Sequence, residues 1–364
     1  MKIKKFDLAE QHYQNKNYQQ SLELLESSGE ESWQVKWHIA RCFWQLGQYQ
    51  KALDFFMQAF NLESNITTCM SLVNSYIMLD EEKSAYELLV KINQAKPELV
   101  DSAAHLSLFE FTYGKKQIAL KILERARIDN PNNAYLSLLL YSVNKLAGFE
   151  KACQYFPALQ LDIRIDSQRR SIDFIAKQLK NFDDIKLTTS PLSVLSYALE
   201  HAQLDGHVIE CGVFYGRSIN YLAAKYEGEI HGFDSFEGLP EDWKTGESKG
   251  SYSTHGKLPE VASNVTLHTG WFEDTLPVFA KEQSAPICLL HIDCDLYSST
   301  STIFKQLGHL IRPGSVIVFD DFLGYPGFES SEFKAFYEFI ENSKLDFEFI
   351  CFGLMPHGAA VRIK

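Results

Sequence analysis

Residues 208–218 read VIECGVFYGRS, and this stretch decides the fold of the C-terminal half of the chain. The run begins as a short, apolar, β-rich segment, and a helical segment follows it directly. Between them, Glu210, Gly212 and Gly216 form an E-x-G-x-x-x-G turn. Glycine at such a turn lets the backbone approach a ligand closely. A strand, a glycine turn and a helix in this order predict an α/β sheet, in which the turn either approaches a ligand or is only a structural tight turn.

The same alternation of β-rich and helical segments continues to the end of the chain. It predicts a Rossmann-like, doubly wound parallel sheet. Only five residues, LMPHG, separate the last two runs, so these should form an antiparallel hairpin at one edge of the sheet. The predicted strands cover residues 208–213, 229–235, 265–270, 287–295, 315–321, 347–353 and 359–364.

The N-terminal part contains an internal repeat. A small residue followed by long apolar ones recurs at spacings of 31, 33, 34 and 33 residues, at Ser21, Ala52, Ala85, Ala119 and Ala152. Glycines at positions 47, 114 and 148 stand where a helix would end in a left-handed residue. This punctuation predicts about five helix pairs over residues 4–159, and the pairs resemble tetratricopeptide repeats (TPR). The fold class is therefore an all-α solenoid followed by an α/β domain.

Helix pairs of this kind cannot bury their apolar faces alone, so they stack and leave a concave surface. We expect a protein or peptide partner on the TPR surface. The alternative is that aromatic residues such as Trp37, Phe43 and Trp44 serve only as interhelical core. Residues 160–188 should form a connecting helix and linker, and residues 189–364 the second domain.

Composition limits the classes of partner and compartment. The net charge of -12 argues against nucleic acid or anionic lipid as a partner. The seven cysteines are an odd number without a C-x-x-C pair, which favours a reducing cytoplasm. The longest apolar runs have the length of strands, so we expect no membrane span. The sequence makes no prediction of the oligomeric state.

A second acid gives the glycine turn its chemical meaning. Asp234 follows Glu210 by 24 residues at the end of the next predicted strand, where an acid can accept ribose hydroxyls. The dinucleotide pattern G-x-G-x-x-G is absent, and an acid at position 210 suits a cationic amino-acid ligand better than pyrophosphate. Trp271 and Phe272 offer a surface for adenine, although Trp271 could equally be core.

Four motifs then resemble the macrocin O-methyltransferase family. They are DSFEGLPEDW (234–243), GWFEDTLP (270–277), LHIDCDLYSST (290–300) and VIVFDDF (316–322), and the likeness extends over residues 189–364. The resemblance implies a class I fold, S-adenosyl-L-methionine as cofactor, and Mg²⁺-dependent methylation of a sugar hydroxyl. It implies Asp295, Asp320 and Asp321 as metal ligands. We expect the cofactor site to comprise Glu210, Gly212, Gly216, Ser218, Asp234, Ser235, Trp271 and Phe272.

The residues themselves support a cation. Asp293 and Asp295 should end one strand, and Asp320 and Asp321 the next, at the rim where such sheets bind ligands. Four crowded carboxylates repel one another unless a cation lies among them, and Mg²⁺ prefers oxygen ligands. Regular strand alternation would put Asp293 and Asp295 on one face, and would prevent Asp320 and Asp321 from sharing one. Simple solvation at the strand end is the alternative for the last two.

The chain also departs from that family. The family's DDY is DDF here, and the TPR array is additional. Residues 246–264 are rich in Gly and Ser and should form a loop over the site. Within it, His255 is a candidate general base, with Asp293 as another, although a loop histidine is commonly only solvated. An acceptor pocket could use the aromatic residues Phe214, Tyr215, Trp243, Phe322, Tyr325 and Phe328.

These observations predict an S-adenosylmethionine-dependent O-methyltransferase. Its acceptor would be a hydroxyl of a sugar, glycan or secondary metabolite. One alternative is a protein or peptide methyltransferase that presents its substrate from the TPR groove. A second is a TPR scaffold without turnover, which the retained acids disfavour. A third, an oxidoreductase, is disfavoured by the glycine pattern.

Overall fold

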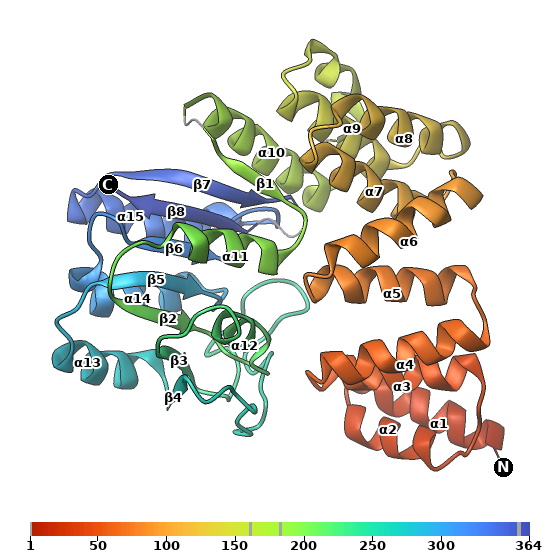
Figure 1. Ribbon diagram of the computed structural model, residues 1–364, viewed down its shortest axis with the longest axis horizontal. Helices are drawn as coiled ribbons and strands as arrows, with labels where there is room; N and C mark the ends of the chain where they lie inside the picture. The colour runs from red at the N-terminus through yellow and green to blue at the C-terminus, as the bar shows by residue number, and fades with distance from the viewer. Residues whose placement is uncertain (1, 160–161, 182–183, 355–357) are drawn as a thin grey trace. The chain divides into compact units, whose positions relative to one another are not determined.

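The computed structural model of the chain describes residues 2–159, 162–181, 184–354 and 358–364. Internal contacts divide the chain into two compact units, residues 1–106 and residues 107–364. The division falls inside a helix of the fourth repeat, so the last repeats group with the sheet (Figure 1). The domain bounds that the sequence predicts, 4–159, 160–188 and 189–364, stay a prediction.

The repeats form helix pairs, as predicted. Five pairs occur in the described N-terminal residues, and the second member of the last pair is a 3-10 helix. A long helix, α10, follows in the predicted connecting segment. The elements are α1 (Lys2–Gln14), α2 (Tyr18–Glu26), α3 (Trp33–Gln45), α4 (Tyr49–Leu62), α5 (Ile66–Met78), α6 (Glu82–Ala95), α7 (Val100–Thr112), α8 (Lys116–Asp129), α9 (Ala134–Leu146), η1 (Glu150–Leu159) and α10 (Ile163–Asn181).

Small residues and left-handed turns explain these pairs. All five small repeat residues are at most 3% exposed, because each lies where two helices approach closely. Gly47, Gly114 and Gly148 have φ of 71°, 80° and 76° at the turns within pairs. The repeats without a glycine there use Lys16 and Asp80, both at φ 61°. The turn geometry is therefore retained where the sequence signal is weaker.

The C-terminal unit contains a mixed sheet. Its order is β1-β7-β8-β6-β5-β2-β3-β4 among the described residues. Only β8 runs antiparallel to its neighbours, which confirms the predicted edge-region hairpin with β7. The strands are β1 (Lys186–Thr188), β2 (His207–Cys211), β3 (Ile230–Asp234), β4 (Val265–Thr269), β5 (Ile287–Ile292), β6 (Val316–Phe319), β7 (Phe347–Gly353) and β8 (Ala359–Ile363).

Helices flank this sheet (Figure 1). Contacts join α11 to α12 and, separately, α13 to α14 and α14 to α15. As predicted, α11 begins with a capped turn, in which Ser190 Oγ accepts the N–H of Ser193 at 3.0 Å before Pro191. These elements are α11 (Pro191–His201), α12 (Arg217–Ala223), α13 (Phe272–Glu282), α14 (Tyr297–Leu307), η2 (Gly308–Leu310), η3 (Phe328–Ser330) and α15 (Glu332–Ser343).

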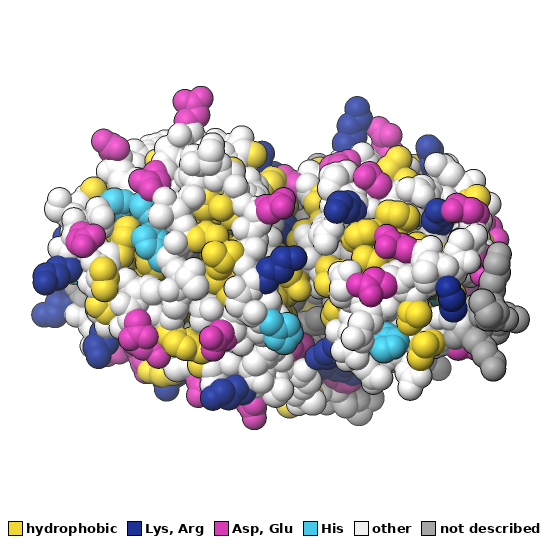
Figure 2. Space-filling view, turned by 90° about the horizontal axis from the view of Figure 1, so that it is seen from below, with side chains coloured by type: hydrophobic (Ala, Val, Ile, Leu, Met, Phe, Trp, Pro, Cys, Tyr) yellow, Lys and Arg dark blue, Asp and Glu magenta, His cyan; other side chains and the backbone are white. Residues whose placement is uncertain are grey.

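The chain order of the strands reverses between β2 and β5, which are neighbours in the sheet. Ligands of open α/β sheets bind at such a switch point, beyond the carboxyl ends of the strands. In the view of Figure 2, acidic and basic side chains are interspersed, without a continuous basic patch among the residues drawn in colour on that face. None of the helices in the described ranges is long and apolar enough to cross a membrane.

Candidate functional site

A cavity of about 650 Å³ opens at this switch point. Its size is that of a site for a cofactor or other small molecule. It lies beyond the carboxyl ends of β2 to β6 and is bordered by the first turns of α13 and α14. Nine predicted site residues line it: Gly212, Asp234, Ser235, Trp271, Phe272, Asp293, Asp295, Asp320 and Asp321.

Four other predicted site residues are absent from the lining. Glu210 and Ser218 are buried beneath the glycine turn. Gly216 begins α12 with φ 77° and faces Pro259, whose Cβ would lie 3.2 Å from an added Cβ. His255 is exposed in the loop, also at positive φ. These residues shape or border the site rather than form its wall.

Glu210 forms a buried pair with a histidine of the next strand. Its carboxylate lies 2.8 Å from His291 Nδ1 and accepts a hydrogen bond from Ser218 Oγ at 3.1 Å. Burial by itself lowers the pKa of His291, but the hydrogen bond and charge of Glu210 outweigh it and raise the pKa to about 9. Burial also raises the pKa of the Glu210 carboxyl, so the two groups form one buried hydrogen-bonded pair.

Asp234 organises the two turns that border the cavity. Its Oδ2 accepts the N–H groups of Val213 and Phe214, both at 2.8 Å, and its Oδ1 accepts the N–H of Phe236 at 2.7 Å. A carboxylate has about four acceptor positions, so about one remains for a ligand hydroxyl. Asp234 thus has a structural role that the sequence did not indicate, and its ribose contact stays a prediction.

The four aspartates converge on one side of the cavity, but not by strand alternation. Strand β5 ends at Ile292 and β6 at Phe319, so all four follow their strands. The alternation argument was wrong for this reason, and Asp320 and Asp321 both line the cavity. Asp295 has φ 65°, a conformation unusual for a residue with a side chain.

Ser331 and Glu332, from a later segment of the chain, hold Asp295 in this conformation. Ser331 Oγ donates to the carbonyl oxygen of Asp295 at 2.5 Å, and the N–H of Asp295 donates to Glu332 Oε1 at 3.2 Å. Ser331 and Glu332 are both buried. The strained turn is therefore fixed at both of its backbone polar groups.

Crowding changes the acidity of these groups. Burial raises the pKa of Asp293 well above its usual range, and the charge of Asp320 adds to this. The pKa of Asp295 is raised in the same way by burial and by Asp321. Burial and Asp320 raise the pKa of Asp321 to about 6, although Lys244 opposes the shift. Acids whose charged forms are disfavoured this strongly are suited to sharing a cation.

A group with metal-ligand geometry lies within this cluster. Ligand atoms of His291, Asp293 and Asp320 all lie within 4.8 Å of one another. This group shares only Asp320 with the predicted ligands. Asp293 and Asp320 offer carboxylate oxygens of the kind that Mg²⁺ prefers, and His291, whose Nδ1 faces Glu210, offers its other ring nitrogen beside them.

The predicted loop over the site contributes a tyrosine to the cavity wall. Tyr252 lines the cavity at φ 62°, three residues before the exposed His255. Burial raises its pKa, and the charges of Asp295 and Glu247 add to the effect. Of the predicted acceptor aromatics Phe214 lines the cavity, whereas Phe322 and Phe328 are buried core. Sequence reasoning missed several lining residues, among them Arg217, Glu241, Tyr252, Ser298, Ser299 and Thr302.

Residues 209–322 match the family model of a methyltransferase domain. This part of the chain is similar to a methyltransferase domain. The matched range begins in β2 and ends just after β6, so it includes the glycine turn, Asp234 and all four aspartates of the cavity. The methyltransferase domain therefore includes the whole described carboxylate cluster except Glu332.

A curated relative shares part of this domain. The 8-demethyl-8-(2,3-dimethoxy-alpha-L-rhamnosyl)-tetracenomycin-C 4'-O-methyltransferase of Streptomyces olivaceus is 28% identical over 162 residues. The match covers 36% of this chain and 59% of the relative, so the chain spans about three-fifths of the relative's length.

Solved structures resemble each part of the chain at low identity. The O-methyltransferase NovP is 19% identical with a TM-score of 0.38, and the match covers 48% of this chain and 80% of NovP. CalS11, a calicheamicin methyltransferase, has the same identity and TM-score, with 62% and 91% covered. MamA AMB-1 is 18% identical with a TM-score of 0.36, with 43% and 88% covered.

Proposed function

We propose that the chain is an S-adenosylmethionine-dependent O-methyltransferase. Its acceptor is a hydroxyl of a sugar, a glycan or a secondary metabolite. The observation that carries the proposal is a cavity whose lining combines Asp234, beside the glycine turn, with four further aspartates. The name of the Streptomyces olivaceus relative, a 4'-O-methyltransferase for a rhamnosyl-tetracenomycin, supports an oxygen acceptor of this class.

The cofactor is assigned to the side of the cavity bordered by β2, β3 and β4. Asp234 and Ser235 offer polar groups there, and Trp271 and Phe272 offer aromatic surface for adenine. Gly212 lets the backbone turn at the cavity wall. Glu210, Gly216 and Ser218 support that turn from beneath or beside it. When bound, S-adenosylmethionine supplies a methyl group activated by its sulfonium.

The aspartates are assigned to the acceptor side. Asp295, Asp320 and Asp321 would hold Mg²⁺, which when bound lowers the pKa of a hydroxyl beside it. In the transfer, an acceptor oxygen forms a bond to the methyl carbon as the carbon–sulfur bond breaks. Asp293 lines the cavity and is placed to accept the proton released by the hydroxyl, with the loop residue His255 as the second candidate base.

Calorimetric titration of the full chain with S-adenosylhomocysteine, with Mg²⁺ and with chelator, tests the cofactor site. We expect micromolar binding in both conditions. The Asp320→Asn variant should bind S-adenosylhomocysteine nearly as tightly as wild type but should lose methyl transfer to a sugar acceptor. Absence of S-adenosylhomocysteine binding in wild type would refute the proposal. Full methyl transfer by Asp320→Asn, or by wild type in excess chelator, would contradict the proposed role of the metal.

The helix pairs are assigned to binding a protein or peptide partner, because stacked pairs present an extended surface. If the full chain methylates free sugar acceptors, the helix pairs bind a partner that is not the methylated substrate. Transfer to a peptide and not to sugars would instead show that they present the substrate. We also assign the chain to a reducing compartment such as the cytoplasm. The cysteines whose side chains are described are free thiols, which supports this assignment. Cell fractionation would test it.

A further inference from the structure

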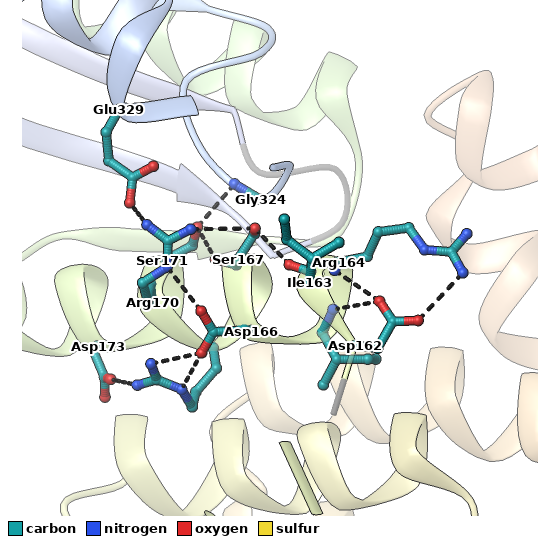
Figure 3. Close-up of polar contacts among 12 residues, drawn as sticks. Asp162, Ile163, Arg164, Asp166, Ser167, Arg170, Ser171, Asp173, Gly324 and Glu329 are labelled. Atoms are coloured by element: carbon teal, nitrogen blue, oxygen red, sulfur yellow. Dashed lines mark hydrogen bonds and ion pairs between the residues drawn. The ribbon is translucent and has the colours of Figure 1, made fainter. Parts of the chain in front are cut away.

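Helix α10 contacts the segment that follows the paired aspartates. Ser171 Oγ accepts the N–H of Gly324 at 2.8 Å and donates to the carbonyl of Ser167 at 2.9 Å (Figure 3). Ser171 is fully buried. The Ser171 hydroxyl therefore supplies a hydrogen-bond acceptor to the N–H of Gly324, three residues after Asp321.

The preceding residue of α10 makes a second contact with the same segment. Arg170 forms an ion pair with Glu329 and also bonds Asp166 Oδ2 at 3.1 Å (Figure 3). Its guanidinium carbon lies 5.5 Å from the ring centroid of Phe328. Asp166 thus orients Arg170 from within α10, and Arg170 holds Glu329 and Phe328.

Both ends of this segment reach the carboxylate cluster. Residues 320–332 begin with Asp320 and Asp321 in the cavity wall. They end with Ser331 and Glu332, which hold the backbone of Asp295. The two contacts with α10 lie between these ends, so a shift of the segment would move three of the four aspartates.

We propose that α10 is a positioning helix for the carboxylate cluster, acting through Ser171 and Arg170. The affinity of the cluster for a divalent cation depends on these two contacts, whereas the affinity for the cofactor does not. The inference rests on one part of the proposed function, the binding of a divalent cation by the carboxylate cluster.

The same helix is tied to the last helix pair. Asp173, less than one turn beyond Ser171, bonds the hydroxyl of Tyr141 and lies 3.3 Å from Lys145, both on α9. Arg169 holds the other oxygen of Asp173 at 2.6 Å. The acids are therefore connected to the helical repeats by a short series of buried and half-buried polar contacts. Removing the contacts of α10 should loosen the acids without removing any of them.

Hydrogen–deuterium exchange of the full chain tests the positioning directly. We expect Ser171→Ala to increase exchange in peptides within residues 320–331 several-fold, because Gly324 loses its acceptor. Ser142→Ala is the matched control, because Ser142 is also a buried helical serine and its hydroxyl donates to the carbonyl of Leu138. It should leave the segment unchanged. Unchanged exchange in a folded Ser171→Ala variant would overturn the proposal.

Calorimetric Mg²⁺ titration of the same proteins supplies the second readout. Ser171→Ala, Arg170→Ala and Glu329→Ala should each weaken Mg²⁺ binding about three- to tenfold, with S-adenosylhomocysteine affinity within twofold of wild type. The double variant of Arg170 and Glu329 should bind Mg²⁺ no more weakly than Arg170→Ala, because each single change already removes the ion pair between the two residues. Additive losses, or equal losses of cofactor affinity, would overturn the proposal. A wild type that binds neither ligand would refute the proposed function instead, and the exchange result would still decide the positioning role.

Discussion

A Cβ on Gly212 would lie 1.7 Å from the carbonyl oxygen of Asp293. The first glycine of the turn therefore packs directly against the backbone of the first cavity aspartate. The N–H of Asp293 in turn donates to the carbonyl of Cys211 at 2.9 Å. The glycine turn and the carboxylate cluster, which are separate motifs in the sequence, are thus in direct backbone contact.

This contact predicts that Gly212→Ala is strongly destabilising. Gly246 provides a matched control, because it has φ 94° against 97° for Gly212 but nothing within 4 Å of an added Cβ. Gly246→Ala should cost only the left-handed strain of about 1–2 kcal/mol. Gly212→Ala should cost at least about 2 kcal/mol more, because backbone must move. Urea unfolding midpoints measure the difference, and equal losses would contradict the steric argument.

Replacement of Asp234 by Asn should weaken cofactor binding. An amide has one accepting oxygen, so at least one of the three backbone N–H groups at Asp234 would face an NH₂ group. An unsatisfied N–H costs about 1–3 kcal/mol, so S-adenosylhomocysteine affinity should fall about tenfold or more. Asp242→Asn is the control, because Asp242 accepts one loop N–H outside the cavity. Calorimetry would decide, and wild-type affinity in Asp234→Asn would argue against this organising role.

Cation binding should depend on pH. Burial and Asp320 raise the pKa of Asp321 to about 6, so a proton competes with a cation at lower pH. Mg²⁺ affinity should be about tenfold lower at pH 5 than at pH 7.5, since about nine-tenths of the Asp321 carboxyl is protonated at pH 5. Asp321→Asn should bind more weakly at both values and with a flatter pH dependence. A steeper dependence in the variant would assign the titration to another group.

The two candidate bases can be separated by turnover. Asp293→Asn should lower kcat by about 10²–10⁴-fold, the usual contribution of a general base, because this carboxylate lines the cavity. His255→Ala should remain within about threefold of wild type, because His255 is exposed and outside the lining. S-adenosylhomocysteine binding serves as the folding control for both variants. A large loss in His255→Ala would place the base in the loop.

Three histidines on β2, β3 and β4 should make stability depend on pH. His231 Nδ1 lies 3.3 Å from His268 Nε2, and the His207 and His231 ring centroids are 5.6 Å apart. Burial lowers the pKa of all three, while Glu229 opposes the shift, so the folded chain binds fewer protons than the unfolded chain. The stability they contribute is present above the unfolded pKa of about 6.5 and is lost as pH falls through it.

The raised pKa values of the aspartates change stability with pH in the opposite direction. The contribution of the histidines is therefore measured as the difference between a histidine variant and wild type. We expect the loss of urea midpoint from pH 7.5 to pH 5 to be smaller in His231→Gln than in wild type. The exposed His309 gives the control His309→Gln, whose loss should equal that of wild type. An unchanged loss in His231→Gln would show that the histidines do not contribute.

Local patterns predicted most of the fold because their causes are local. Buried small residues and left-handed turns recur with the repeat length, so the helix pairs could be counted from spacing alone. The seven predicted strands all exist, although several end earlier than expected. The eighth, β1, was missed because three residues carry too little periodicity, and pairing with β7 defines it.

The candidate site was predictable only where a motif carried its own chemistry. Acids at strand ends and glycines at the turn could be located from their order in the chain. The partners of these residues could not, because His291 lies 81 residues from Glu210, and Ser171 lies 153 residues from Gly324. No sequence pattern pointed to Tyr252. It lies in a loop, and whether a loop side chain lines a cavity depends on the backbone conformation of that loop.

By itself, the sequence determined the kinds of element, their order, and the acids available to the site, because these follow from periodicity and from side-chain chemistry. Tertiary structure alone decided which groups meet. It buried Glu210 against His291, engaged Asp234 with three backbone donors, and brought α10 against the segment beside the carboxylates. The physical reason is that hydrogen bonding, burial and charge coupling act over a few ångströms in space, whereas the residues concerned are far apart along the chain.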